Sequence, residues 1–340
     1  MKKFNFANLP TRIEKLERLS KETGANIYIK RDDQTGSEFS GNKIRKLEFS
    51  VKEALENGCN FLITCGGIQS NHCRTTVAIA TKLGLRSAVL LRISEQPPVK
   101  GNYFLDKLMG ADVRFCTRDE YSNSRMQIME EMAAGYAAQG YKPYIIPEGA
   151  SNEVGTMGYF TAMKEIALQE QELGIKFDTV VCATGSGGTY SGLYLGNELF
   201  CLGKRVLGFC VCDNNQYFTD IAKKLAPGAI RYFSDEEKAL ARKVFGNEGP
   251  NPEHIEFCDG YVGIGYALSR PEELEFIKKI ARLEGLVLDP VYTGKAMYGV
   301  YNELKEGGIL HDHVGTDKNI LFIHTGGLYG LFPVSESFVW

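Results

Sequence analysis

The sequence predicts an α/β protein of the doubly wound class, and two observations support this. Short β-rich runs alternate along the chain with helical patterns, and several of these runs are apolar throughout, as expected of parallel strands that helices cover on both faces. The 340 residues are long for one compact core, and 44% of them are apolar, which is enough to fill two cores. We therefore expect two domains.

The expected elements follow in chain order. Strands are predicted at 27–30, 61–65, 87–93, 112–116, 143–146, 179–183, 206–211 and 320–324. Helical periodicity is found around 70–83, 101–109, 119–138, 153–172, 188–200, 235–245, 270–284 and 294–305. Residues 245–256 contain Gly and Pro that interrupt the pattern, which predicts either a flexible stretch or a simple surface loop.

Charge and hydropathy exclude several classes of protein. A net charge of −3 and a pI near 6.1, with scattered basic residues, provide no basic surface for nucleic acid. Residues 1–20 are polar and charged and lack the apolar core of a signal peptide, and no uninterrupted apolar run is long enough to cross a bilayer. We expect a cytoplasmic protein with neither a nucleic-acid nor a membrane partner.

The nine cysteines do not indicate a disulfide framework or a metal site. Their number is odd, no CxxC occurs, and Cys182, Cys210 and Cys212 lie in apolar runs that are predicted to be buried strands. We expect reduced packing residues and no bound metal.

Lys43 is the first candidate for chemistry. It lies in the run Ser40-Gly-Asn-Lys-Ile-Arg-Lys-Leu-Glu-Phe49, where an adjacent small residue lets a lysine reach into a tight site. A lysine amine becomes nucleophilic when burial or a neighbouring cation lowers its pKa, and Arg45 and Lys46 are the expected cations. The alternative is a basic helix N-terminus on the surface, because lysine is mostly exposed.

A glycine-rich run follows about 140 residues later. Thr184-Gly-Ser-Gly-Gly-Thr189 comes directly after one predicted strand and before a helical pattern, so its backbone N–H groups can converge on a phosphate. It lacks the Gly-Lys-Ser/Thr of a nucleotide loop and the acidic residue that a dinucleotide ribose requires. A tight strand-helix turn is the alternative. A reactive lysine together with a phosphate loop suggests pyridoxal 5′-phosphate (PLP).

Three other runs place polar groups where an element begins or ends. Ile68-Gln-Ser-Asn-His-Cys-Arg74 follows a predicted strand and a glycine turn, where open α/β sheets present binding groups, although Ser70 and Asn71 can also be simple helix caps. Tyr292 lies at an expected helix start, and Ile323-His-Thr-Gly-Gly327 closes a predicted strand.

Together, these runs resemble the D-cysteine desulfhydrase and 1-aminocyclopropane-1-carboxylate (ACC) deaminase family. The resemblance rests on Asn26-Ile-Tyr-Ile-Lys-Arg-Asp-Asp33, Gly41–Phe49, Ile68–His72, Asp289-Pro-Val-Tyr-Thr-Gly-Lys-Ala-Met297 and His324–Gly327, and it covers nearly the whole chain. It implies PLP fold type II, the tryptophan synthase β group, with two domains that are each an open, largely parallel twisted sheet flanked by helices. A large PLP-binding domain of residues 1–49 and 161–340, a small domain of residues 50–160 and a homodimer are implied as well.

The resemblance also implies how the cofactor is held. Lys43 would form the Schiff base, Asn71 would hydrogen-bond the 3′-oxygen of PLP, and Thr325 would approach the pyridine nitrogen. A neutral hydroxyl stabilises the protonated form of that nitrogen less than a carboxylate would. The ring is therefore a weaker electron sink. The phosphate would be held by Gly185, Ser186, Gly187, Gly188 and Thr189.

The implied substrate groups lie in the same runs. Ser70 and Asn71 would meet the substrate carboxylate, and His72 is counted with them although its own role stays open. Tyr266, in Gly263-Ile-Gly-Tyr-Ala267, and Tyr292 would face the reacting centre. Ser70, Tyr266 and Tyr292 are equal candidates for a second acid or base beside Lys43.

The implied reaction is α,β-elimination from D-cysteine, or a related β-substituted alanine, to pyruvate, ammonia and sulfide. ACC deaminases typically carry Glu and Leu where this chain has Thr293 and Thr325, which favours the D-cysteine branch over ACC deamination. L-cysteate sulfo-lyase activity and a PLP-binding protein without catalysis remain alternatives. A nucleotide-dependent oxidoreductase is disfavoured, because no dinucleotide fingerprint lies near the first strand.

The chain departs from the family pattern at three places. Ala267, in the loop around Tyr266, stands where the family usually has glycine. The stretch 95–102 and the run Pro147-Glu-Gly-Ala-Ser151, where the family often has Val-Gly-Gly-Ser, also differ. The leaving group and the configuration at the α-carbon are therefore inferred from kinship alone.

Overall fold

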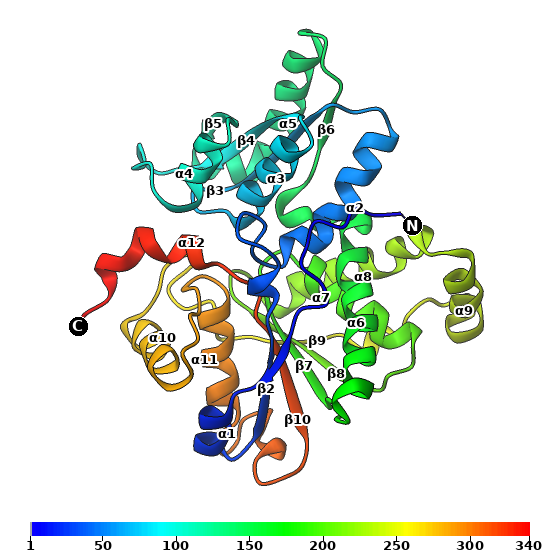
Figure 1. The fold of residues 1–340 in the computed structure, drawn as a ribbon, viewed down its shortest axis with the longest axis vertical. Coiled ribbons are helices and arrows are strands. Elements are labelled where there is room, and N and C mark those ends of the chain that lie inside the picture. The colour runs from blue at the N-terminus through cyan, green and yellow to red at the C-terminus, as the bar shows by residue number, and fades with distance from the viewer. Residues whose placement is uncertain (1) are drawn as a thin grey trace.

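The computed structural model describes residues 2–340, and its strands form two separate sheets (Figure 1). All eight predicted strands are confirmed. The larger sheet has the order β1 (Ile13–Lys15), β2 (Asn26–Lys30), β10 (Asn319–Ile323), β7 (Thr179–Thr184), β8 (Arg205–Cys210) and β9 (Glu256–Cys258). The smaller has the order β5 (Asp112–Cys116), β4 (Arg86–Arg92), β3 (Phe61–Gly67) and β6 (Pro143–Ile145). Every described pairing is parallel except that of β1 with β2.

Helices flank both sheets, and the eight predicted helices are confirmed. They are α3 (Asn71–Lys82), α4 (Gly101–Leu108), α5 (Arg118–Ala137), α6 (Glu153–Leu173), α7 (Gly188–Leu199), α9 (Asp235–Phe245), α10 (Pro271–Glu284) and α11 (Thr293–Glu303). The sequence did not predict β1, β9, α1 (Glu17–Thr23), α2 (Lys43–Glu56), α8 (Asn215–Ala229) or α12 (Leu328–Leu331). The fold is therefore the α/β arrangement that the sequence predicts, with largely parallel sheets covered on their faces.

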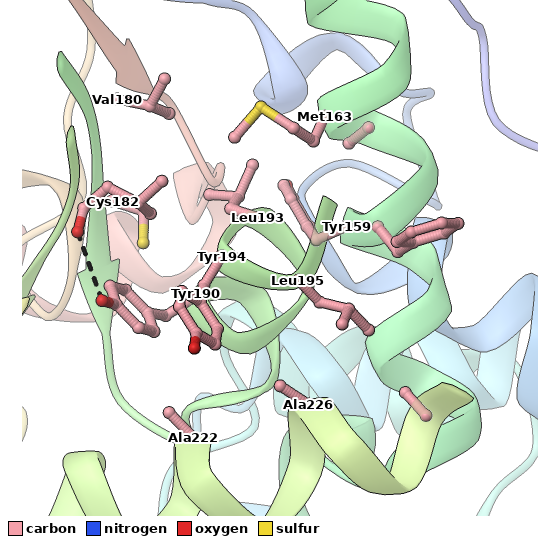
Figure 2. Packing of buried hydrophobic residues seen from close by; sticks show 14 of the residues in the cluster. Tyr159, Met163, Val180, Cys182, Tyr190, Leu193, Tyr194, Leu195, Ala222 and Ala226 are labelled. Atoms are coloured by element: carbon pink, nitrogen blue, oxygen red, sulfur yellow. Dashed lines mark hydrogen bonds between the residues drawn. The ribbon is translucent and has the colours of Figure 1, made fainter. Parts of the chain in front are cut away.

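The larger sheet is buried on both faces because apolar side chains along each strand point alternately to one face and to the other. In β10, Leu321 and Ile323 pack with α6 and α7, whereas Ile320 and Phe322 pack with α10 and α11 on the opposite face. Figure 2 shows the first of these cores, where Met163 and Leu193 lie near β7. Two packed faces leave only the strand ends available for a site.

The carboxyl ends of strands from both sheets point toward one region. Gly66 and Gly67 at the end of β3, and Thr184 at the end of β7, line the same cavity. All strands of the smaller sheet lie within residues 61–145. The predicted domain boundary at 49/50 falls inside α2, and the predicted boundary at 160/161 falls inside α6. The division into domains at these positions therefore stays a prediction.

Within residues 2–340, no helix has the length and apolar character needed to span a membrane. The segment after α9 forms an exposed loop that ends in a short 3-10 turn, Pro252–His254, before β9. This corresponds to the surface-loop alternative for residues 245–256.

Candidate active site

The cavity between the two sheets brings together nearly all the predicted site residues. Those that line it are Lys43, Ser70, Asn71, His72, Gly185, Ser186, Gly187, Thr189, Tyr266, Tyr292 and Thr325. Gly188 does not line the cavity and is buried as the first residue of α7. These residues lie as far apart in sequence as 43 and 325, so only the fold assembles them.

Lys43 is the first residue of α2, and its side chain is partly buried at the cavity. Its Nζ donates to Asn42 Oδ1 at 2.9 Å and lies 5.8 Å from the centre of the Tyr292 ring. Burial lowers the pKa of Lys43 to about 8, against the opposing effect of the Asp289 and Glu148 carboxylates. A larger fraction of the amine is therefore unprotonated and nucleophilic near neutral pH than in an ordinary lysine.

The expectation that Arg45 supplies a cation next to Lys43 is wrong. Arg45 is buried, and its guanidinium forms ion pairs with Asp32 at 2.8 Å and Glu165 at 2.9 Å. A helix turns about 100° per residue, so Lys43 and Arg45 point in different directions. The neighbouring cation that lowers the pKa of Lys43 is Arg74.

The glycine-rich loop joins β7 to α7 and turns its small residues toward the cavity. Gly187 has φ +81°, a left-handed conformation that glycine adopts without strain. A Cβ on Gly185 would lie 2.7 Å from the Tyr292 ring, and a Cβ on Gly188 would lie 2.7 Å from Lys46 Nζ. Side chains at these positions would fill the space, so glycine is required for the close approach of the loop to its surroundings.

Two residues beside this loop were missed as site residues. Ser151 Oγ donates to Ser186 Oγ at 2.7 Å and accepts from the Gly188 N–H at 3.2 Å. Lys46 Nζ donates to the same Ser151 oxygen at 3.0 Å. The spacing of Lys46, three residues after Lys43 and thus almost one helical turn, was the available sequence signal. No comparable signal marked Ser151.

The buried amine beside the loop fits a phosphate-bearing cofactor. Lys46 is fully buried, and within the described residues no carboxylate forms an ion pair with it. Burial and the charge of Lys43 keep the pKa of Lys46 well below its ordinary value. A buried amine next to the N-terminus of α7, with N–H groups that a phosphate can accept from, is the donor set that an anion requires. The residues present therefore fit PLP.

The N-terminus of α3 forms the opposite wall of the cavity. Ser70 is its N-cap and accepts from the Cys73 N–H at 3.1 Å, while Asn71 Oδ1 accepts from Asn102 Nδ2 at 2.9 Å. His72 is buried, and its Nε2 contacts Thr64 Oγ1 at 2.7 Å. Burial and nearby lysines hold the pKa of His72 well below its usual value, so the ring is neutral.

Two tyrosines meet at the side of the cavity formed by the larger sheet. The hydroxyls of Tyr266 and Tyr292 lie 2.7 Å apart. Burial raises the pKa of both, so both hydroxyls stay protonated at neutral pH. Tyr292 directly precedes α11, and Asp289 holds that end by accepting from the Tyr292 N–H at 3.0 Å.

The loop that carries Tyr266 has a left-handed backbone at Ala267, the position where the family usually has glycine. Ala267 has φ +59°, which is strained for a residue with a Cβ. Lys295 from α11 holds the loop in place, since its Nζ donates to Val262 O at 2.6 Å and Gly265 O at 2.9 Å. The loop therefore keeps Tyr266 in the cavity in spite of the substitution.

Thr325 follows β10 at the base of the cavity and is mostly buried. Its carbonyl accepts from the Asn42 N–H at 3.1 Å, which ties the end of β10 to the residue before Lys43. Asn42 in turn donates through Nδ2 to Thr189 Oγ1 at 2.9 Å. One hydrogen-bonded chain thus connects the lysine, the glycine-rich loop and the end of β10.

Comparison with known proteins agrees with this geometry. The family model described as "Pyridoxal-phosphate dependent enzyme" matches residues 5–326. A bifunctional D-cysteine desulfhydrase/ACC deaminase of Arabidopsis thaliana is 40% identical over 97% of this chain and 79% of its own. A putative ACC deaminase of Pyrococcus abyssi is 40% identical over 96% of this chain and 92% of its own.

Solved structures give the same result. The crystal structure of an ACC deaminase homologue has a TM-score of 0.85 at 37% identity, covering 98% of this chain and 94% of its own. The structure of O-ureido-L-serine synthase shares the fold, with a TM-score of 0.65 at 16% identity over 97% of this chain and 93% of its own. Because the family model matches residues 5–326 and its relatives cover nearly the full length, the chain belongs to the PLP-dependent enzymes, and PLP is its cofactor.

Proposed function

We propose that the protein is a lyase that converts D-cysteine, or a related β-substituted alanine, to pyruvate, ammonia and the released β-substituent, which is sulfide for cysteine. The observation that carries the proposal is Lys43, whose pKa is lowered to about 8 in a cavity that it shares with the paired hydroxyls of Tyr266 and Tyr292. This arrangement offers a base for the α-proton and a neutral acid for the departing group.

Bound PLP would supply a carbonyl carbon for the substrate amine and an electron sink for the α-carbon. Lys43 would hold that carbonyl carbon before substrate binds, and its freed amine would then accept the α-proton. Lys46 and the N–H groups of the loop Gly185–Thr189 would hold the phosphate, and Asn71 and Thr325 the ring. The backbone at Ser70 and Asn71 would orient the substrate carboxylate at the N-terminus of α3.

The tyrosine pair would protonate the leaving sulfur. Each hydroxyl is kept neutral by burial, and each can donate to the other or to a substrate atom placed against both. Water would then convert the remaining three-carbon fragment to pyruvate and ammonia. His72 keeps the proposed substrate-binding role only through its backbone or Nδ1, because Thr64 occupies Nε2.

ACC deamination is the second candidate, because the relatives carry that name. Thr293 argues against it. Its hydroxyl donates to Asp289 Oδ1 at 2.7 Å, and it adds no carboxylate to the cavity at the position where the ACC enzymes typically have Glu. Opening a carbon ring without a good leaving group is a harder task, for which an additional carboxylate is a plausible aid.

The test is release of 2-oxo acid and sulfide from D-cysteine, with L-cysteine, L-cysteate and ACC in parallel. Pyruvate with equimolar sulfide from D-cysteine alone supports the proposal. Pyruvate from cysteate, or 2-oxobutyrate from ACC, would keep the PLP-dependent reaction but replace D-cysteine as the assigned substrate. No product from any of the four would leave a PLP-binding protein without lyase activity.

A pair of lysine variants controls this experiment. Lys43→Ala should lose both turnover and the absorbance of the covalently held cofactor. Lys52→Ala changes a lysine on the same helix α2 that lies outside the cavity, and it should keep both. Retained turnover in Lys43→Ala would remove Lys43 from its assigned role.

We also propose that the protein is a homodimer, which the family resemblance supports, and that it is cytoplasmic. The name of the Arabidopsis relative places that protein in mitochondria. Sedimentation velocity tests the assembly, with a mass twice the 37.8 kDa of one chain as the expected result. A single species of 37.8 kDa at micromolar concentration would contradict it.

A further inference from the structure

Asn102, the second residue of α4, is fully buried and contacts Asn71 at the cavity wall. Its side-chain oxygen accepts from Arg74 Nε at 3.2 Å. Its Nδ2 donates to the Gln69 carbonyl at 3.0 Å and to Asn71 Oδ1 at 2.9 Å. Both N–H groups of the Asn102 amide therefore have an acceptor, and its oxygen has a donor.

These partners determine which way round the Asn102 amide lies. An arginine side chain has donors and no acceptor, so the Asn102 atom that faces Arg74 must be the oxygen. A backbone carbonyl has no donor, so the atom that faces Gln69 must be the amide nitrogen. Both neighbours select the same orientation. The opposite orientation would place N–H groups against each other at Arg74 and oxygens against each other at Gln69.

The orientation of Asn102 determines that of Asn71. Because Asn102 presents a donor, Asn71 turns its oxygen toward Asn102 and its amide nitrogen away. Among residues 2–340, Asn71 Nδ2 has no acceptor. Asn71 lines the cavity, so its two N–H groups are available there to an oxygen of a ligand. Without the donor from Asn102, either end of the Asn71 amide could face the cavity.

Buried contacts hold this network in place. Arg74 is fully buried in α3, and its guanidinium also donates to the carbonyls of Ser40, at 2.8 Å, and Glu38, at 2.5 Å. Gln69 Oε1 accepts from the backbone N–H of Asn102 at 2.8 Å. The two groups that orient the Asn102 amide are thus themselves fixed, one to the segment before α2 and the other to the start of α4.

We propose that Asn102 is a positioning residue that acts through Asn71, because it fixes the Asn71 amide with its N–H groups directed at the 3′-oxygen of PLP. This inference rests on the role proposed above for Asn71. A donor at that place favours the ionised form of the 3′-oxygen, whereas an amide oxygen would repel it. Asn102 itself does not line the cavity.

The experiment compares PLP with 3-deoxypyridoxal 5′-phosphate, which keeps the aldehyde and the phosphate but lacks the 3′-oxygen. Equilibrium dialysis of the full-length apoprotein gives both dissociation constants, and their ratio is the readout. Asn71→Ala removes the amide itself. Asn102→Leu removes the orienting donor without adding a charge. Asn102→Asp presents only acceptors, which should turn the oxygen of Asn71 toward the cavity.

We expect Asn71→Ala and Asn102→Asp to reduce the ratio in favour of PLP by about tenfold to a hundredfold, the effect of losing a hydrogen bond to a charged group. Asn102→Leu should reduce it by about twofold to tenfold, because the freed amide can still turn its N–H groups to the cofactor. In an Asn71→Ala background, Asn102→Leu should change the ratio no further, since a positioning residue acts only through its partner.

Asn197→Leu is the matched control. Asn197 is also buried and exchanges two hydrogen bonds with the backbone of Lys204, each of 3.0 Å, but it lies outside the active-site cavity. It should keep the ratio of the parent protein. Equal weakening of both cofactors in the Asn102 variants, with the ratio unchanged, would show a purely structural role and overturn the inference. The melting temperature of each variant establishes that it is folded.

The same measurements separate this inference from the roles on which it rests. An unchanged ratio in Asn71→Ala would remove the contact between Asn71 and the 3′-oxygen, and the inference with it. A changed ratio in Asn71→Ala together with an unchanged ratio in Asn102→Asp would overturn the inference alone. Cofactor binding is measured without turnover, so failure to release pyruvate from D-cysteine would reject the proposed elimination and leave the positioning role supported.

Discussion

At the scale of single residues, the reactivity of Lys43 is set by opposing influences. Burial disfavours its charged form, while the carboxylates of Asp289 and Glu148 favour it, and the resulting pKa is about 8. Glu148 lines the cavity, so a carboxylate of this chain faces the site there. Its effect on the lysine can be measured separately from catalysis.

We predict that PLP attaches to the apoprotein faster as pH rises, with a midpoint about pH 8, because only the unprotonated amine of Lys43 reacts. Glu148→Gln should move this midpoint to lower pH, since a carboxylate stabilises the ammonium and raises its pKa. Stopped-flow absorbance across a pH series measures the midpoint. Glu130→Gln, on the exposed side of α5, should leave it in place, and a rise in the midpoint for Glu148→Gln would contradict the assignment.

Ala267 provides a second prediction at this scale. Its left-handed φ of +59° costs an L-residue about 1–2 kcal/mol, while glycine loses roughly 0.4–1 kcal/mol more entropy on folding. Ala267→Gly should therefore raise the free energy of unfolding by about 0.5–1 kcal/mol, measured by urea denaturation. Ala134→Gly, at an exposed helical position in α5, should lower it by roughly 0.5–1 kcal/mol. A loss of stability in Ala267→Gly would mean that the loop is not strained.

Site residues that belong to continuous motifs could be predicted, and those that depend on packing could not. Lys43, Tyr292 and the loop Gly185–Thr189 carry recognisable patterns, and the fold brings them to one cavity. Ser151 lies in a run that shows no recognisable pattern. It contacts Ser186 and Lys46 only because the fold packs segments that are distant in sequence against one another.

At the scale of elements, apolar patterns predicted eight of the ten described strands but not every helix. α2 was not predicted because its buried face includes the charged residues Arg45, Lys46 and Glu48. Burial along this helix therefore does not follow hydropathy. α8 contains Pro227, which predicts a break rather than a helix. β1 and β9 have three residues each, too few for a periodic signal.

α11 and the Tyr266 loop are coupled through Lys295, which leads to a prediction for these elements. Lys295→Met keeps the length of the side chain but leaves the carbonyls of Val262 and Gly265 without their donor, at a cost of about 1–3 kcal/mol. We expect faster hydrogen exchange of the amides in 261–268 and lower turnover. The matched control is Lys305→Met, an exposed lysine beyond the end of α11. Unchanged exchange in the loop for Lys295→Met would contradict the coupling.

At the scale of the whole molecule, a buried ion cluster joins segments that lie far apart in the chain. Asp32 accepts from Arg45 Nε at 2.8 Å, from Thr11 Oγ1 at 2.7 Å and from the Tyr159 hydroxyl. Glu165 pairs with both Arg45 at 2.9 Å and Lys30 at 2.6 Å. The N-terminal segment, β2, α2 and α6 are thereby fixed to one another.

This cluster predicts how the protein responds to acid. Burial alone would raise the pKa of Asp32, but Arg45 and its other partners lower it to about 2 from 3.8. Because the folded pKa is the lower one, Asp32 stabilises the fold above about pH 4 and this contribution is lost as pH falls toward 2. Urea unfolding at pH 7, 4 and 3 should show the decline.

Asp32→Asn should be destabilised by about 3–5 kcal/mol at pH 7, since the buried Arg45 would lose one of its two carboxylate partners and keep only Glu165. Part of the acid-dependent decline should disappear with it. Asp317→Asn, at an exposed position, should match the parent protein at each pH. Equal stability of Asp32→Asn and the parent protein would show that the charge of Asp32 does not stabilise the fold.

The cavity takes its walls from both sheets and from residues as distant in sequence as Asn42 and Thr325. A ligand that binds there binds only the folded chain, so its free energy of binding adds to the free energy of unfolding. At a concentration a hundred times its dissociation constant, PLP would contribute about 2.7 kcal/mol. The persistence of the protein against unfolding and proteolysis thus becomes a function of vitamin supply, and the fold itself reports the availability of its cofactor.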